Sequence, residues 1–164
     1  AGTGFAARYK ALDPVIESDF DLSVIGQNSV GFLWATLPPT QQQEVSALFA
    51  QFTVASYVSQ FSGYAGQKFV LLPTEKTLGA RKIVETQLVS NDDSAPVELD
   101  YVVADGAGGW KITDILLNGT ISQVAVHASD FSGLVSSGDA SQLIAALKSK
   151  IATLSGGQAG SAGS

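Results

Sequence analysis

His127 is the single histidine of the chain, so any Ser–His–Asp catalytic triad would have to include it. Ser122, Ser129 and Asp130 lie near it in the sequence and carry the hydroxyl and carboxylate groups that a triad needs. These residue types are common, and their arrangement here forms no recognised motif. We therefore interpret His127 as a surface or capping residue and predict no catalytic role for it.

Two aspartates, Asp100 and Asp114, suggest a second kind of chemistry. A carboxylate inside an apolar, cone-shaped α+β fold can act as a general base, as in ketosteroid isomerase. Asp100, however, alternates with Leu99 and Tyr101 and so belongs to the polar face of its strand. Three hypotheses stay open at this point: a small enzyme with Asp100 or Asp114 as base, a protein-only docking module, and a protein that binds an apolar ligand.

Metal and phosphate motifs are the next candidates. Asp92 and Asp93 lie in a turn with Asn91 and Ser94, but the spacing of a calcium loop is missing. The chain has no cysteine, which excludes disulfides, thiolate metal sites and a cysteine nucleophile. The glycine-rich segment 106–109 precedes a strand, whereas a phosphate loop opens a helix. We predict neither a metal nor a cofactor.

Composition limits the classes of partner. The chain has 164 residues, of which 45% are hydrophobic and 15% charged, and this balance is typical of one globular domain. A net charge of −6 and the lack of a basic stripe argue against nucleic-acid binding and favour a partner with a basic face. The sequence contains no run of about 18 apolar residues, so it predicts no membrane-spanning helix. The chain contains no methionine, which is consistent with an exported protein whose signal peptide has been removed.

The first third of the chain has helical periodicity. Apolar residues between Pro14 and Ile25 predict one helix, and a second, short helical stretch precedes Pro38. Thr40 is the expected cap of a long helix that ends near Tyr64. This helix carries two apolar stripes on nearly opposite sides, which indicates that it is enclosed on two sides or bends near Thr53. It either lies in an ordinary core or separates a core from an apolar cavity.

In the second part of the chain, the spacing of apolar residues changes from that of helices to that of strands. Residues 68–74, 81–90, 96–105 and 109–118 predict four strands, and a parity switch near Asp114 indicates a β-bulge or a strand end covered on both faces. Residues 121–136 and a final segment after Asp139 predict two helices. The fold class expected is α+β, with a four-stranded antiparallel sheet, helices packed on one face and an enclosed apolar cavity. We predict one domain over residues 8–154 with flexible tails at 1–7 and 155–164.

Three long stretches, residues 20–45, 57–73 and 98–147, resemble the MlaC family of toluene-tolerance proteins. With the segments between them, the resemblance extends from Arg8 to Leu154 and depends on order and spacing along the whole chain. The run Trp110-Lys111-Ile112, together with residues 114–119 and Ser122-Gln123, is most similar to the hopanoid-associated HpnM branch.

This resemblance implies a periplasmic lipid carrier and not an enzyme. Such a protein holds the tails of a phospholipid or hopanoid in a cavity between sheet and helices. It shuttles the lipid between an inner-membrane ABC-type complex and an outer-membrane partner. Tyrosine hydroxyls are the expected polar contacts near the cavity mouth. The expected tail contacts are large apolar and aromatic residues: Ile25, Leu33, Trp34, Phe52, Tyr57, Phe61, Leu99, Tyr101, Val103, Ile115, Leu117, Val124 and Phe131.

Overall fold

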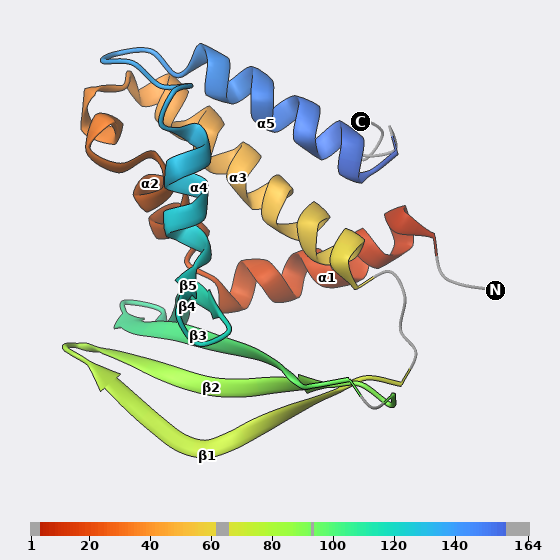
Figure 1. Cartoon of the computed structure of the whole chain (residues 1–164). Coiled ribbons are helices and arrows are strands. Elements are labelled where there is room, and N and C mark those ends of the chain that lie inside the picture. The colour runs from red at the N-terminus through yellow and green to blue at the C-terminus, as the bar shows by residue number, and fades with distance from the viewer. Residues whose placement is uncertain (1–3, 62–65, 93, 157–164) are drawn as a thin grey trace.

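The computed structural model describes residues 4–61, 66–92 and 94–156, and in it a group of helices lies on one side of a curved sheet (Figure 1). Its elements, in chain order, are α1 (Phe5–Asp19), α2 (Leu22–Val30), the 3₁₀ helix η1 (Gly31–Thr36), α3 (Pro39–Gln60), β1 (Lys68–Leu78), β2 (Arg81–Val89), β3 (Val97–Gly106), β4 (Gly109–Leu117), β5 (Ile121–Ser122), α4 (Gln123–Phe131) and α5 (Ser141–Leu154).

The sheet is an antiparallel meander in the order β1-β2-β3-β4-β5. The α+β class and the antiparallel sheet agree with the prediction, but the sheet has five strands instead of four. The additional strand, β5, is only two residues long and lies where we predicted the irregular start of a helix. Two residues are too few to show the period of a strand, so the sequence could not reveal it.

Two irregularities interrupt the pairing of the strands. In the β3–β4 pair, Val102 lies opposite Asp114 and Val103 lies opposite Ile112, so Thr113 is an extra residue. This confirms the bulge predicted from the parity switch near Asp114. In the β1–β2 pair, the register shifts between Leu71 and Glu75, a segment that contains Pro73.

The first predicted helix is two helices. α1 ends at Asp19, Phe20 forms an isolated bridge to Ile112, and Asp21 then caps α2 by accepting a hydrogen bond from the Val24 N–H. The apolar spacing continues across this break, which is why we predicted a single helix. α1 also begins at Phe5, so part of the segment predicted as a tail is helical, and Pro14 lies inside the helix instead of at its start.

α3 carries its two apolar stripes because it separates two clusters of buried side chains. Val45, Leu48 and Phe49 pack in one cluster with residues of α5, among them Leu143 and Leu147. The second half of α3 contributes Val54 and Val58 to another cluster, which includes Ile16 of α1 and Ile25 of α2. α3 is therefore enclosed on two sides, the first of the two arrangements that its pattern predicted.

The start of α3 differs from the prediction. Pro38 is the N-cap and Pro39 the first helical residue, so Thr40 lies within the first turn and does not cap the helix. The described helix ends at Gln60, and the predicted end at Tyr64 lies outside the described residues.

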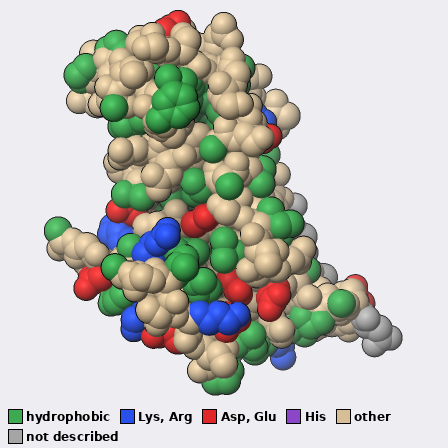
Figure 2. Space-filling view, turned by 60° about the vertical axis from the view of Figure 1, so that its left-hand side comes forward, with side chains coloured by type: hydrophobic (Ala, Val, Ile, Leu, Met, Phe, Trp, Pro, Cys, Tyr) green, Lys and Arg blue, Asp and Glu red, His purple; other side chains and the backbone are tan. Residues whose placement is uncertain are grey.

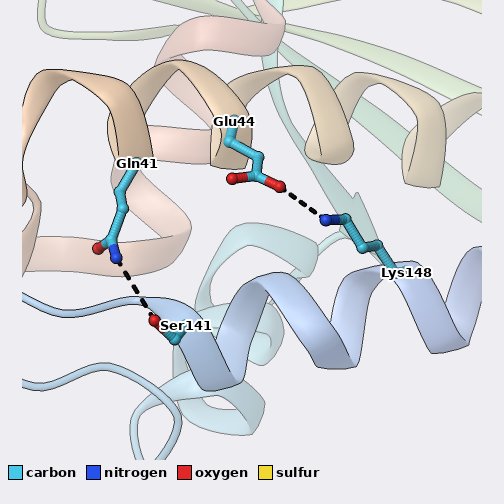
Figure 3. Close-up of polar contacts among 4 residues, drawn as sticks. All are labelled: Gln41, Glu44, Ser141 and Lys148. Atoms are coloured by element: carbon cyan, nitrogen blue, oxygen red, sulfur yellow. Dashed lines mark hydrogen bonds and ion pairs between the residues drawn. The ribbon is translucent and has the colours of Figure 1, made fainter.

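Polar contacts join α3 and α5 along their exposed sides. Lys148 Nζ lies 2.7 Å from Glu44 Oε1, and Gln41 Nε2 lies 3.5 Å from Ser141 Oγ (Figure 3). Gln41 also accepts a hydrogen bond of 2.8 Å from the Ala140 N–H just before α5. Exposed pairs of this kind contribute at most about 1 kcal/mol each, so the buried cluster between the two helices holds them together.

Candidate functional site

A pocket of about 380 Å³ lies between the helices and the sheet. Its helical wall comes from the second half of α3, from α2 and from the start of α4, and its sheet wall comes from β3 and β4. Small-molecule sites usually have volumes of about 300–1,000 Å³ and mostly apolar walls. A second hollow, of about 900 Å³, lies beside the β3–β4 hairpin, but several charged side chains line it, including Glu17, Arg81 and Lys111. The first pocket is therefore the one suited to an apolar ligand.

Most of the residues predicted as tail contacts lie in the wall of this pocket. They are Ile25, Phe52, Tyr57, Phe61, Leu99, Tyr101, Ile115, Leu117 and Val124. They come from α2, α3, α4 and both central strands, and the alternation of β3 and β4 turns their apolar residues towards the helices.

Four predicted contacts lie outside the wall. Leu33 and Trp34 of η1 pack against the cluster between α3 and α5, and Phe131 is part of that cluster with 2% of its surface exposed. Val103 has the same strand parity as Tyr101 but lies beyond the bulge, where it pairs with Ile112. Sequence periodicity does not distinguish a core position from a pocket position on the same apolar face.

Sequence reasoning missed a polar line along the pocket. Thr53, Ser56 and Gln60 lie at i, i+3 and i+7 on α3, and all three line the pocket. Gln123 lines it from the start of α4. The helical spacing of Thr53, Ser56 and Gln60, next to the predicted contact Tyr57, could have revealed them from the sequence. These side chains give one side of an apolar pocket a set of hydrogen-bonding groups.

Two tyrosines meet across the pocket. Tyr57 of α3 and Tyr101 of β3 both line it, and each hydroxyl influences the pKa of the other. Burial raises the pKa of the Tyr57 hydroxyl far above its ordinary value, and Tyr101 raises it further. Burial also raises the pKa of Tyr101. Both hydroxyls are therefore neutral at physiological pH and act as dipoles inside the pocket, not as acids or bases.

His127 lines the pocket among aromatic rings, so the prediction of a surface or capping residue was wrong. Its ring stacks on Phe131 with centroids 5.8 Å apart and meets the ring of Phe52 edge-on at 5.5 Å. Burial lowers the pKa of the imidazole, although Asp130 opposes this effect. A neutral, stacked histidine at this position is a part of the pocket wall.

The side chain of Asp114 links β4 to the start of α4 through hydrogen bonds. Its Oδ1 accepts hydrogen bonds from the N–H groups of Ile115 at 2.8 Å and Val124 at 3.1 Å, and its Oδ2 accepts one of 2.5 Å from the Ser122 hydroxyl. Ser122 in turn caps α4 through the Ala125 N–H. Asp114 reaches the pocket wall, but Asp100 lies on the other face of β3. Of the two acids considered as a general base, Asp114 therefore lies at the pocket and Asp100 does not.

We expect Asp114→Ala to lower the free energy of unfolding by about 2–3 kcal/mol, because three donors lose a charged acceptor. Asp114→Asn, which keeps one carbonyl oxygen, should cost less. Urea unfolding followed by circular dichroism measures both values. Asp130→Asn, a change at an exposed acid of α4, is the matched control. Equal stability of Asp114→Ala and the control would show that the carboxylate does not anchor α4.

The described residues contain no helix that is both long and apolar enough to span a membrane. The sequence model of the family described as MlaC protein matches residues 2–149. No curated protein matches the chain significantly. Among solved structures, the phospholipid-binding protein from Ralstonia solanacearum, in complex with a phospholipid, has a similar fold, with a TM-score of 0.77 and 23% sequence identity. The alignment covers 92% of this chain and 84% of that protein.

Proposed function

Because this chain belongs to the MlaC family, we propose that it is a lipid carrier that holds the acyl chains of a phospholipid in the pocket between α3 and β3–β4. The observation that carries this proposal is the pocket itself: ten apolar or aromatic side chains form most of its wall, and the polar side chains of α3 lie along one side. The phospholipid bound to the structurally similar protein from Ralstonia solanacearum supports the choice of ligand class.

The physical need for such a carrier follows from the free energy of hydrating an acyl chain. At about 0.8 kcal/mol per CH₂, a chain of about 16 carbons in water is penalised by roughly 12 kcal/mol, so free diffusion across an aqueous gap is negligible. When the pocket wall is as apolar as the bilayer interior, the free energy of moving the lipid from one to the other is close to zero in both directions. No bond is made or broken, and the protein needs no catalytic residue for this function.

Aromatic rings mark a route from the pocket to the surface. The Tyr57 ring stacks on Phe61 with centroids 5.8 Å apart, and the Phe61 ring lies 5.9 Å from that of Phe69 on β1. Phe61 is 37% exposed and Phe69 54% exposed, so the row of rings ends in solvent. We place the mouth of the pocket at Phe61 and Phe69. The polar side chains of Ser56 and Gln60 then lie along the path of the ligand.

We further propose that the protein works in the periplasm, the compartment of the MlaC family, between an inner-membrane ABC-type complex and an outer-membrane partner. The charged side chains visible in Figure 2 gather over the sheet end of the molecule and are sparse at the helical end. With a net charge of −6, a docking partner would present a basic surface. A hopanoid in place of the phospholipid is the ligand that the HpnM-like segment around Trp110 suggests.

Native mass spectrometry of freshly purified protein tests the proposal. We expect a bound species at about one equivalent, and organic extraction followed by lipid analysis should identify a phospholipid or a hopanoid. Protein stripped of lipid by detergent should regain it from vesicles of phosphatidylethanolamine and phosphatidylglycerol. Protein that purifies without lipid and takes up none from such vesicles would contradict the proposal.

A further inference from the structure

Three carboxylates meet on the face of the sheet that is turned away from the pocket. Leu99 and Tyr101 of β3 face the pocket, so strand alternation turns Glu98 and Asp100 to the other face. The pairing of Gln87 with Glu98 brings Glu85 of β2 beside Asp100. One oxygen from each of Glu85, Glu98 and Asp100 lies within 4.8 Å of the others. Glu98 and Asp100 are neighbours on one face of β3, and the register of β2 against β3 brings Glu85 to them.

Asp100 is the unusual member of this cluster. It is 2% exposed, and its Oδ1 is buried without a hydrogen-bond partner. A buried carboxylate oxygen without a donor or a cation is costly, and proteins pair such groups or place a metal ion against them. The unpartnered oxygen of Asp100 therefore points to a ligand that supplies positive charge at this position.

The neighbouring groups leave that charge uncompensated. Within the described part of the chain, the ion pair made by these carboxylates joins Lys76 Nζ to Glu85 Oε1 at 2.6 Å, and the Thr74 hydroxyl donates to Glu85 Oε2 at 2.6 Å. Glu85 is thus satisfied. One ammonium group faces three carboxylates, and the Lys76 side chain is 63% exposed and free to turn into solvent.

The backbone approaches the cluster closely at Gly119. This residue has φ +69°, and a Cβ atom there would lie 3.2 Å from Glu98 Oε2 and 3.4 Å from Asp100 Oδ2. A side chain would crowd the two carboxylates, so glycine at this position lets the loop lie against the cluster.

We propose that Glu85, Glu98 and Asp100 form a binding site for Ca²⁺. Carboxylate oxygens are the ligands of hard cations, and Ca²⁺ takes them at about 2.3–2.6 Å, so two oxygens on opposite sides of the ion lie about 5 Å apart. Oxygens within 4.8 Å of one another can bind one such ion, and Ca²⁺ tolerates the irregular geometry of ligands from two strands. Mg²⁺, at about 2.0–2.1 Å, requires opposite ligands about 4 Å apart in a stricter octahedron. On binding, the ion replaces the Lys76 ammonium group and ties β2 to β3 behind the pocket wall.

Calcium titration of the full chain, first freed of metal by a chelator, tests this proposal. We expect isothermal titration calorimetry to show one Ca²⁺ per chain and thermal unfolding to show a saturable rise in Tm, with a smaller response to Mg²⁺. Asp100→Asn and Glu98→Gln should weaken Ca²⁺ binding at least about tenfold, the change expected from losing one anionic ligand. Glu75→Gln is the matched control, because Glu75 is an exposed acid of β1 that pairs with Lys82.

Lys76→Gln separates an ion site from an ordinary charge cluster. It removes the ammonium group that competes for the carboxylates, so Ca²⁺ should bind more tightly while the metal-free protein becomes less stable. A wild-type protein whose Tm and calorimetric signal do not respond to millimolar Ca²⁺ would overturn the proposal. An equal loss of binding in Glu75→Gln and Asp100→Asn would also overturn it, since the response would then reflect net charge alone.

Discussion

Tyr101→Asp is expected to remove most of the lipid that co-purifies with the protein. Tyr101 lines the pocket from β3, so the substitution places a carboxylate against apolar walls. An unpaired charge facing an acyl chain costs several kcal/mol, and each 1.4 kcal/mol reduces affinity about tenfold. We therefore expect the bound fraction in native mass spectrometry to fall at least about tenfold, and Phe61→Asp at the mouth should act in the same direction.

The matched control is Val103→Asp. Val103 lies two residues further along β3, shares the strand parity of Tyr101 and does not line the pocket. This variant introduces the same charge into the same strand and should keep its lipid, provided that circular dichroism shows a folded protein. Tyr101→Phe, which keeps the ring and loses the hydroxyl, should also retain lipid. If folded Tyr101→Asp carries as much lipid as wild type, the pocket assignment is wrong.

Phe131→Ala is expected to lower the free energy of unfolding by about 3–5 kcal/mol, the usual cost of truncating a fully buried phenylalanine. Its ring is 2% exposed and packs edge-on against Phe49 with centroids 5.7 Å apart. Urea unfolding measures this loss. Because Phe131 lies in the cluster between α3 and α5 and not in the pocket wall, the lipid bound per folded molecule should stay near the wild-type value.

Phe32→Ala is the control for this second prediction. Phe32 is 89% exposed, and truncating an exposed side chain usually changes stability by less than about 0.5 kcal/mol. A stable Phe131→Ala protein that has lost its lipid would reverse our assignment and make Phe131 a tail contact, as the sequence pattern first suggested.

Periodicity was sufficient where a single period dominates an element. The alternation in residues 96–105 predicted β3 to within one residue at each end, and the parity switch near Asp114 predicted the bulge in β4. The two stripes of α3 likewise indicated a helix enclosed on two sides. These features are local, because the pattern of apolar side chains within one element indicates which of its faces are buried.

Features that depend on distant contacts were beyond the sequence. At the break between α1 and α2, the Asp21 N–H donates a hydrogen bond of 2.8 Å to the carbonyl oxygen of Ile112, a residue far along the chain. The position of the half-buried His127 beside Phe52 and Phe131 depends on how α4 docks. The pocket could be predicted as a list of apolar residues, but its boundary, which excludes Val103 and Phe131, is a property of three-dimensional packing.

The register shift in β1 affects how the protein resists aggregation. β1 is an edge strand, and its Phe69, Val70 and Leu71 are 54%, 41% and 69% exposed, which is the kind of surface on which a foreign strand can add. Pro73 and the break between Leu71 and Glu75 divide this edge into two short segments with different registers. An incoming strand therefore meets few consecutive backbone partners. The chain can keep the exposed ring of Phe69 on this edge without offering a continuous template for fibril growth.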